Sequence, residues 1–242
     1  KQTKKEGNIP MQKSYCMLDL VYSFHGARQH LYPTVLFDTH DVVLIDCGYP
    51  DSVEQLENQL LLHGIRPEAL TVLVLTHQDD DHIGSAAAWK AKYPAIQLAA
   101  SALEAPYISG MRKNLRLSQA EALQSQLPKA QQDWGMQFCA RLQQLQPAAI
   151  DRILHAGDTF SWGGGCEILA TPGHTPGHIS IRSLRNDFLI TGDAAVPENG
   201  QLAIANPEFC LDLNAAQHSL KYIQAYHCPA YLCYHGGILK SP

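Results

Sequence analysis

The feature that most constrains the fold is an apolar strand that runs directly into a polar turn and a helix. Residues 70–76 (Leu-Thr-Val-Leu-Val-Leu-Thr) form a near-continuous apolar run, which is the pattern of a strand covered on both faces. The turn that follows, residues 77–82, reads His-Gln-Asp-Asp-Asp-His, and helical spacing continues to residue 92. Further β-like runs and a helix predicted over residues 52–63 surround this unit. The rhythm predicts an α/β layer architecture.

Composition limits the class of protein. The chain of 242 residues is 45% hydrophobic and 17% charged, which is typical of one globular α/β domain. Its formal charge of -5 argues against a broad basic surface for nucleic acids, and its apolar runs are too short to span a membrane. Seven scattered cysteines indicate reduced thiols and a cytoplasmic location. We therefore expect a small-molecule substrate as the partner; the oligomeric state stays open, with a homodimer as one option.

Residues 104–147 differ from the rest of the chain. This segment is rich in Gln, has few β-branched residues and carries helical spacing of its apolar residues. It predicts a helical insertion within a single domain of residues 1–242. A surface pair of helices and a cap over the active site are both compatible with it, because Tyr107, Met111, Trp134 and Met136 are larger than solvent contact requires.

The turn after the apolar strand concentrates candidate metal ligands. His77, Asp79, Asp81 and His82 lie within six residues, at the edge of the sheet where α/β proteins bind ligands. Three consecutive aspartates repel one another unless a cation is nearby, whereas Asp80 is expected to point elsewhere. An acidic helix N-terminus would explain the carboxylates but not the histidines.

Three later segments carry residues of the same kind. Residues 171–178 (Thr-Pro-Gly-His-Thr-Pro-Gly-His) form a stiff loop that contains His174 and His178. Asp193 and His235 each follow a predicted strand. Because all of them lie at strand ends, we expect one edge of a sheet to collect them.

In this order and spacing, the motifs resemble those of the metallo-β-lactamase-fold superfamily, which includes glyoxalase II and the lactonases. The family pattern is HxHxDH, then a Gly-His loop, a bridging Asp and a terminal His. The resemblance spans residues 42–237 and implies a four-layered αββα sandwich. It also implies two divalent metal ions, held by His77, Asp79 and His174 on one side, by Asp81, His82 and His235 on the other, and bridged by Asp193. Asp46 matches the family aspartate that orients a ligand histidine, and His178 is expected to support the ligands rather than bind metal.

Asp79 is a departure from that pattern, because it stands where the family has its second histidine. A carboxylate adds negative charge and a hard oxygen donor, which favours Fe or Mn more than an all-histidine site would. Zinc remains the first expectation, and Fe or Mn are the alternatives.

The resemblance implies a binuclear metal-dependent hydrolase in which a metal-bridging hydroxide attacks an ester, lactone, thioester or phosphoester. Asp81 is the candidate catalytic residue, because it is placed to orient the hydroxide or to move a proton. Two other classes stay open: an iron-dependent oxidoreductase, such as a sulfur dioxygenase or a diiron protein, and a metal-stabilised protein without catalysis. The substrate is not assigned. The bridging position is Asp193 where zinc β-lactamases resemble each other in a Cys, and Val196 stands where the acyl-homoserine lactonases have a Tyr.

Overall fold

Alternate side chains of strand β6 (Val72–Leu75) enter two different hydrophobic cores. In the computed structural model, which describes residues 14–24 and 26–241, Val72 and Val74 lie in the core between two sheets. Leu73 and Leu75 lie in the core beneath the helices. A strand that is apolar at every position is therefore covered on both faces, as its sequence predicts.

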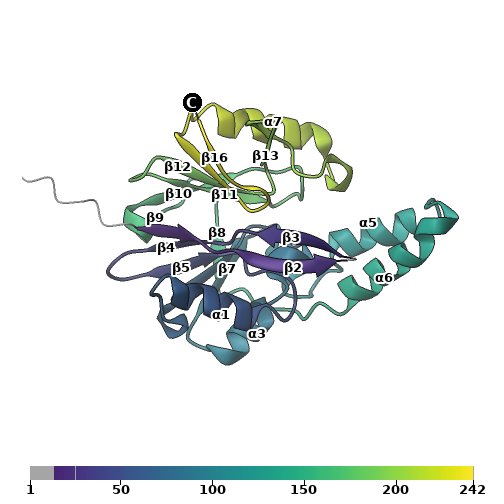
Figure 1. Ribbon diagram of the computed structural model, residues 1–242, viewed down its shortest axis with the longest axis horizontal. Coiled ribbons are helices and arrows are strands. Elements are labelled where there is room, and N and C mark those ends of the chain that lie inside the picture. The colour runs from purple at the N-terminus through teal and green to yellow at the C-terminus, as the bar shows by residue number, and fades with distance from the viewer. Residues whose placement is uncertain (1–13, 25, 242) are drawn as a thin grey trace, which may run out of the picture.

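Two six-stranded sheets pack face to face, and helices cover their outer faces (Figure 1). The first sheet consists, in spatial order, of β1 (Tyr15–Met17), β4 (Thr34–Phe37), β5 (Val42–Ile45), β6, β7 (Gln97–Ser101) and β8 (Arg152–Leu154). The second consists of β16 (Gly237–Lys240), β15 (Ala230–Cys233), β12 (Phe188–Gly192), β11 (Ile179–Ser183), β10 (Cys166–Ala170) and β9 (Thr159–Phe160). Two hairpins, β2–β3 (Leu20–Phe24, Ala27–Leu31) and β13–β14 (Val196–Glu198, Gln201–Ala203), complete the strands.

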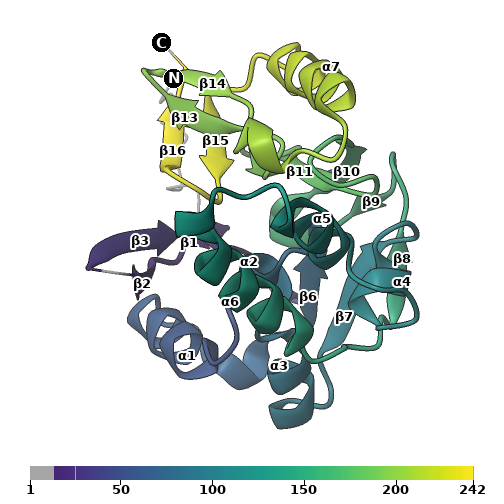
Figure 2. The same cartoon turned by 90° about the vertical axis from the view of Figure 1, so that its right-hand side faces the viewer.

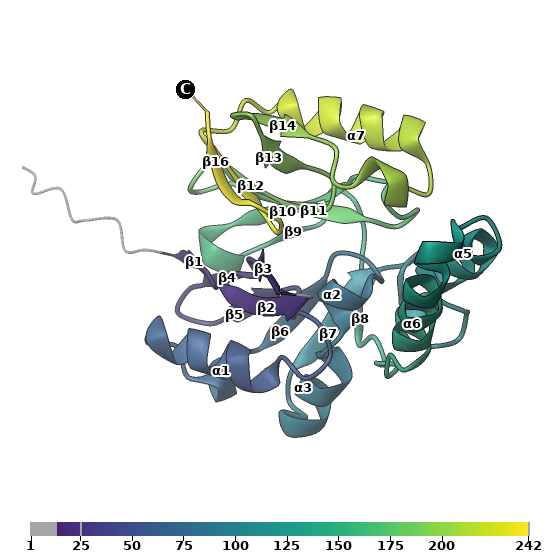
Figure 3. The ribbon, with the colours of Figure 1, turned by 45° about the vertical axis from the view of Figure 1, so that its right-hand side comes forward.

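Helices α1 (Val53–Leu62) and α3 (Ala86–Lys92) pack on the first sheet, and α7 (Leu213–Gln224) packs on the second. Leu60 of α1 and Trp89 of α3 are fully buried against the first sheet, and Ile223 of α7 is fully buried against the second. The order of layers is helix, sheet, sheet, helix (Figure 3). The αββα sandwich predicted from the resemblance is confirmed.

Several element boundaries differ from those expected. The run from residue 15 to residue 24 is two strands, and the helix expected over residues 82–92 is divided into α2 (Asp80–Ile83) and α3. Gly84 lies at that break, where a Cβ would come within 2.3 Å of the Pro50 backbone nitrogen. The backbone of Tyr49 and Pro50 thus approaches so closely that only glycine fits at position 84, and the helical dihedral angles are lost at the next residue, Ser85.

Residues 104–147 contain three helices between the neighbouring strands β7 and β8: α4 (Ala105–Ile108), α5 (Leu115–Gln124) and α6 (Gln132–Gln143). Helices α5 and α6 share a small core of their own, built around Leu117, Cys139 and Leu142. They lie beside α2, at the side of the sandwich (Figure 2). The outer ends of the predicted domain, residues 1–13 and 242, lie outside the described residues.

The cysteines at positions 16, 47, 139, 166, 210, 228 and 233 are all free thiols in the structure. Within residues 14–24 and 26–241, no helix is long and apolar enough to cross a bilayer.

Candidate metal centre

A first group of three candidate ligands lies where β6 ends. His77 follows β6, Asp79 is the N-cap residue of α2, and His174 comes from the loop between β10 and β11. The Oδ2 atom of Asp79 lies 3.5 Å from Nε2 of His77 and 3.0 Å from Nε2 of His174. These atoms lie close enough together to share one ion.

A second group of three consists of Asp81, His82 and His235. Asp81 and His82 belong to α2, and His235 follows β15 of the other sheet. Nε2 of His235 lies 3.3 Å from Oδ2 of Asp81, and Nε2 of His82 lies 3.9 Å from Oδ1 of Asp81. This set also offers two imidazole nitrogens and one carboxylate.

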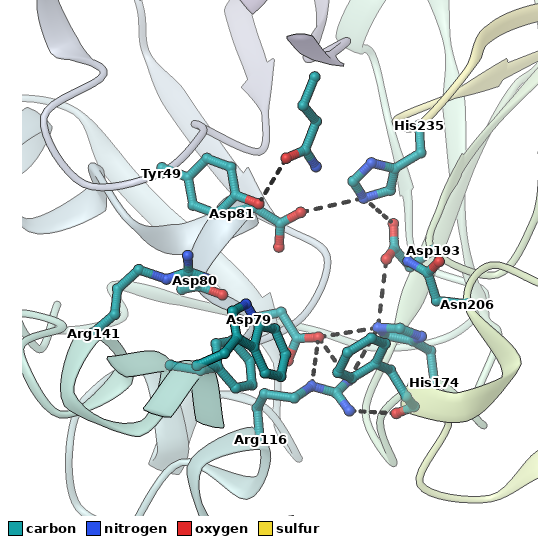
Figure 4. A pocket seen from close by; sticks show the side chains of 14 residues that line it. Tyr49, Asp79, Asp80, Asp81, Arg116, Arg141, His174, Asp193, Asn206 and His235 are labelled. Atoms are coloured by element: carbon teal, nitrogen blue, oxygen red, sulfur yellow. Dashed lines mark hydrogen bonds and ion pairs between the residues drawn. The ribbon is translucent and has the colours of Figure 1, made fainter. Parts of the chain in front are cut away.

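Asp193, which follows β12, lies between the two groups (Figure 4). Its Oδ1 is 3.2 Å from Nε2 of His82 and 3.4 Å from Nε2 of His235. Its Oδ2 is 3.4 Å from Nε2 of His174. One carboxylate therefore faces both groups, one oxygen to each, and the structure brings together all seven residues that the resemblance implies as ligands.

The chemistry of these side chains fits divalent cations. Nε2 of His77, Nε2 of His82 and Oδ1 of Asp193 are buried and make no hydrogen bond with any described residue. Buried polar atoms are nearly always hydrogen-bonded, and these three instead converge on one another, as ligands of a shared cation would. Imidazole nitrogens combined with carboxylate oxygens suit Zn, Fe and Mn.

Asp46 lies behind His82 and determines which nitrogen of that ring faces the site. Its Oδ2 is 2.8 Å from Nδ1 of His82, and its two oxygens also accept hydrogen bonds from the hydroxyl and the backbone N–H of Thr76. Nδ1 therefore carries the proton, which leaves the Nε2 lone pair for a cation.

His178 lies behind Asp193. Its Nε2 accepts a hydrogen bond of 2.9 Å from the Asp193 backbone N–H, and its Nδ1 is 2.8 Å from the Thr171 hydroxyl. Burial and the neighbouring histidine His77 hold the pKa of His178 well below its usual range. A neutral imidazole with both nitrogens engaged positions the Asp193 backbone and has no lone pair to offer a cation.

The histidines and carboxylates of the site shift one another's pKa in both groups. Burial would lower the pKa of both His174 and His235, but nearby carboxylates outweigh it. Asp79 and Asp193 raise the His174 pKa to about 9, and Asp193 and Asp81 raise the His235 pKa to about 10. Burial would likewise raise the pKa of Asp193, but histidines hold it well below its usual value. A cation that binds here would displace protons from the histidines.

Two arginines of the insertion reach the acidic turn. Nη2 of Arg116, on α5, lies 2.7 Å from Oδ2 of Asp79, and Nε of Arg141, on α6, lies 2.8 Å from Oδ2 of Asp80. Asp80 thus points away from both ligand groups, toward α6. Burial would raise the pKa of Asp79, but Arg116 and two histidines hold it well below its usual range.

Sequence reasoning missed three residues of the site. They are Arg116, the buried Glu104 that accepts hydrogen bonds from Gln78 and Gly177, and Tyr234, whose hydroxyl donates to the Asp81 carbonyl and accepts from the Gly48 N–H. The extra negative charge of Asp79 is the signal that could have prompted a search for a basic partner. Nothing in the spacing distinguishes Glu104 or Tyr234 from ordinary core residues.

A cavity of about 200 Å³ opens onto the ligands. Its polar wall includes Asp81 and His235, and its apolar wall consists of Trp134, Phe138 and Phe209. A second cavity, of about 220 Å³, lies between α5 and α6 and is lined by the same three aromatic residues and by Arg116. The ligands therefore lie at the inner end of a cleft that is partly lined by the insertion.

Comparisons with known proteins agree with this architecture. The chain is 28% identical over 171 residues to the "Probable metallo-hydrolase YflN" of Bacillus subtilis; the match covers 66% of this chain and 57% of that protein, little more than half its length. It is 27% identical over 217 residues to the uncharacterized protein YobT of the same organism, covering 85% of this chain and 82% of the relative.

Solved structures show the same fold at low sequence identity. A metallo-beta-lactamase family protein from Thermus thermophilus superimposes with a TM-score of 0.69 at 18% identity, covering 94% of this chain and 75% of its own. A metallo-beta-lactamase from Pontibacter korlensis superimposes with a TM-score of 0.68 at 16% identity, covering 95% of this chain and 91% of its own. The family model of the metallo-beta-lactamase superfamily matches residues 32–224, and the chain therefore belongs to that superfamily.

Proposed function

We propose that this protein is a metal-dependent hydrolase with a binuclear centre, which cleaves an ester, lactone, thioester or phosphoester bond. The observation that carries the proposal is the position of Asp193, with one oxygen toward His174 and the other toward His82 and His235. A carboxylate between two groups of ligands is the arrangement expected of a two-cation site.

In such a reaction the bound cations, Asp81 and the aromatic side chains of the cavity would have separate roles. Bound divalent cations would supply Lewis acidity and a water molecule acidic enough to attack near neutral pH. Asp81 is 14% exposed, faces His235 and lines the cavity, so its carboxylate is placed to accept a proton from that water. The aromatic side chains that line the same cavity would present an apolar surface beside the reacting bond.

The shape of the cleft favours a substrate with an apolar group beside the cleaved bond. The cavity at the ligands adjoins the cavity between α5 and α6, with which it shares Phe138, and Leu123 and Leu127 also line that second cavity. We propose that the reacting bond lies at the ligands and that the apolar group lies between the two helices.

A panel of substrates tests this function. Protein loaded with Zn, Mn or Fe is assayed on esters, lactones, thioesters and phosphoesters, each with a short and a long apolar group. We expect hydrolysis of at least one bond type, and its loss in Asp193→Ala. The control is His155→Ala, since His155 is exposed and remote from the cavity. Protein that is fully loaded and inert on the whole panel would exclude the proposal.

A second candidate is an iron-dependent oxidoreductase, and the observation that favours it is Asp79. This residue gives the first group an oxygen donor, which suits iron better than a further histidine would. Stopped-flow mixing of the reduced iron form with oxygen distinguishes the two functions, since a hydrolase shows no oxidative turnover.

A further inference from the structure

Arg116 occupies an unusual position for a basic residue. It lies on α5, is 3% exposed and lines the cavity at the ligands. Its Nη1 donates hydrogen bonds to the side chain of Gln119 and to the Phe209 carbonyl, and its Nε lies 3.1 Å from Oδ2 of Asp79. The guanidinium is therefore held firmly from three sides, with Nη2 directed toward the ligands.

Nη2 contacts two of the three atoms that the first group would offer to a cation. It lies 2.7 Å from Oδ2 of Asp79 and 3.1 Å from Nε2 of His174 (Figure 4). In the second group, by contrast, Nε2 of His82 makes no hydrogen bond with any described residue, and Asp81 forms its ion pairs with histidines. The two groups thus differ in whether a guanidinium lies against them. This difference matters because a binding cation can displace a proton from a histidine but not the charge of an arginine.

We propose that Arg116 makes the two halves of the metal centre unequal, so that the second group binds a cation tightly and the first binds one weakly. This inference rests on the proposed metal centre. Two physical effects act in the same direction. A guanidinium and a divalent cation repel each other at short range, and both compete for Oδ2 of Asp79.

The same contact explains the departure at position 79. A histidine there would leave the buried guanidinium of Arg116 without the carboxylate that neutralises it, and an unpaired buried charge is strongly destabilising. Asp79 and Arg116 therefore depend on each other. The insertion supplies half of this pair, so it contributes to the properties of the first group.

Metal titration tests the inference without an assay of activity. Protein freed of metal by a chelator is titrated with Zn²⁺ in competition with a coloured chelator, and the bound metal is counted by mass spectrometry. For the unaltered protein we expect two binding steps whose affinities differ at least tenfold. In Arg116→Met we expect the weaker step to tighten at least tenfold while the tighter step stays within threefold.

Two further variants make the result specific. Lys113→Met removes one positive charge at the start of the same insertion, where Lys113 pairs with Glu121 at the surface, and should leave both steps unchanged. Arg116→Lys keeps the charge and should keep the weaker step weak. If Arg116→Met does not fold, Arg116→Gln, which also removes the charge but keeps an amide donor, is titrated in its place and should tighten the weaker step.

The outcomes separate the inference from the proposed function. Two steps of equal affinity in the unaltered protein, or a weaker step in Arg116→Met that does not tighten, would overturn the role of Arg116 and leave the metal centre standing. Absence of any metal binding would overturn the proposed centre itself.

Discussion

Glu104 joins the two segments that carry the first group of ligands. It is fully buried; its Oε2 accepts a hydrogen bond of 3.0 Å from the side chain of Gln78, and its Oε1 accepts one of 2.8 Å from the Gly177 N–H. Gln78 separates His77 from Asp79, and Gly177 precedes His178. A single carboxylate therefore sets the distance between the turn after β6 and the loop after β10.

We expect Glu104→Gln to destabilise the fold. The Oε1 atom of Gln78 already accepts a hydrogen bond from the Leu115 N–H, so the Gln78 amide cannot reverse without losing that contact. The new amide group at position 104 must then face either Gln78 or Gly177 with a donor, which leaves a buried donor unpaired. The cost is about 1–3 kcal/mol of unfolding free energy.

Urea denaturation measures this cost. The matched control is Glu121→Gln, because Glu121 forms its ion pair with Lys113 at the surface. The urea midpoint of this variant should equal that of the unaltered protein. Equal midpoints for Glu104→Gln and the unaltered protein would contradict the bridging role.

The candidate ligands were predictable because they follow strands in short motifs. His77, Asp79, Asp81 and His82 share one turn, where local spacing alone indicates metal chemistry. Arg116 and Glu104 were not predictable, since each acts on a residue 37 or 26 positions away and no local pattern encodes such a pairing.

At the scale of elements, the loop after β10 is held against helix α7. Gly173 in this loop has a φ of +135°, and a Cβ there would lie 2.2 Å from the backbone nitrogen of Ala216 in α7. The two residues before α7 also donate hydrogen bonds to the loop backbone, from the Asp212 N–H to the Gly173 carbonyl and from the Leu211 N–H to the His174 carbonyl. The position of His174 thus depends on how α7 packs against this loop.

Gly173→Ala should therefore lower the free energy of unfolding more than a Gly→Ala change at an uncrowded position. Backbone strain and the collision with α7 together give about 2–6 kcal/mol of unfolding free energy. Gly64 is a matched control, because its φ is +74° but nothing lies within 4 Å of its Cβ position, so Gly64→Ala should cost only about 1–2 kcal/mol. Chemical denaturation of both variants makes the comparison, and equal costs would show that α7 does not restrain the loop.

Helix α6 is expected to select the apolar part of the substrate. Phe138 lines both cavities, whereas Met136 on the same helix is 55% exposed and lines neither cavity at the site. Phe138→Ala should raise KM for substrates with a long apolar group roughly tenfold and change kcat little. Met136→Ala should change neither constant. Equal effects of Phe138→Ala on short and long substrates would place the apolar group elsewhere.

At the scale of the whole molecule, the candidate centre joins the two halves of the sandwich. His77 and His82 follow the first sheet, whereas His174, Asp193 and His235 follow strands of the second. A cation held by both halves binds the folded chain and not the unfolded one, so it stabilises the fold by mass action.

Removal of metal should therefore lower Tm. At a cation concentration of roughly 100 times Kd, the stabilisation is about 2.7 kcal/mol per site. For a chain of this size that corresponds to a fall in Tm of about 5–10 °C when a chelator is added. Differential scanning calorimetry measures the Tm before chelator is added, in its presence, and again after Zn²⁺ is restored.

The variant His235→Ala provides the comparison, because it removes a ligand of the second group and should respond to chelator less than the unaltered protein. A Tm that does not change with chelator in the unaltered protein would contradict a metal centre shared by the two halves.

The sequence by itself determined the α/β layering and the concentration of candidate ligands at strand ends, because both depend on patterns within single segments. The resemblance to a known superfamily then implied the sandwich and the division of these residues into two groups. An apolar strand such as β6 must be covered on both faces, and histidines beside carboxylates at strand ends carry their chemistry with them. Only the tertiary structure decided that an insertion arginine lies against Asp79, that Asp80 turns to Arg141, and that Glu104 joins two loops. These contacts depend on how separate elements pack against one another, which local spacing does not encode.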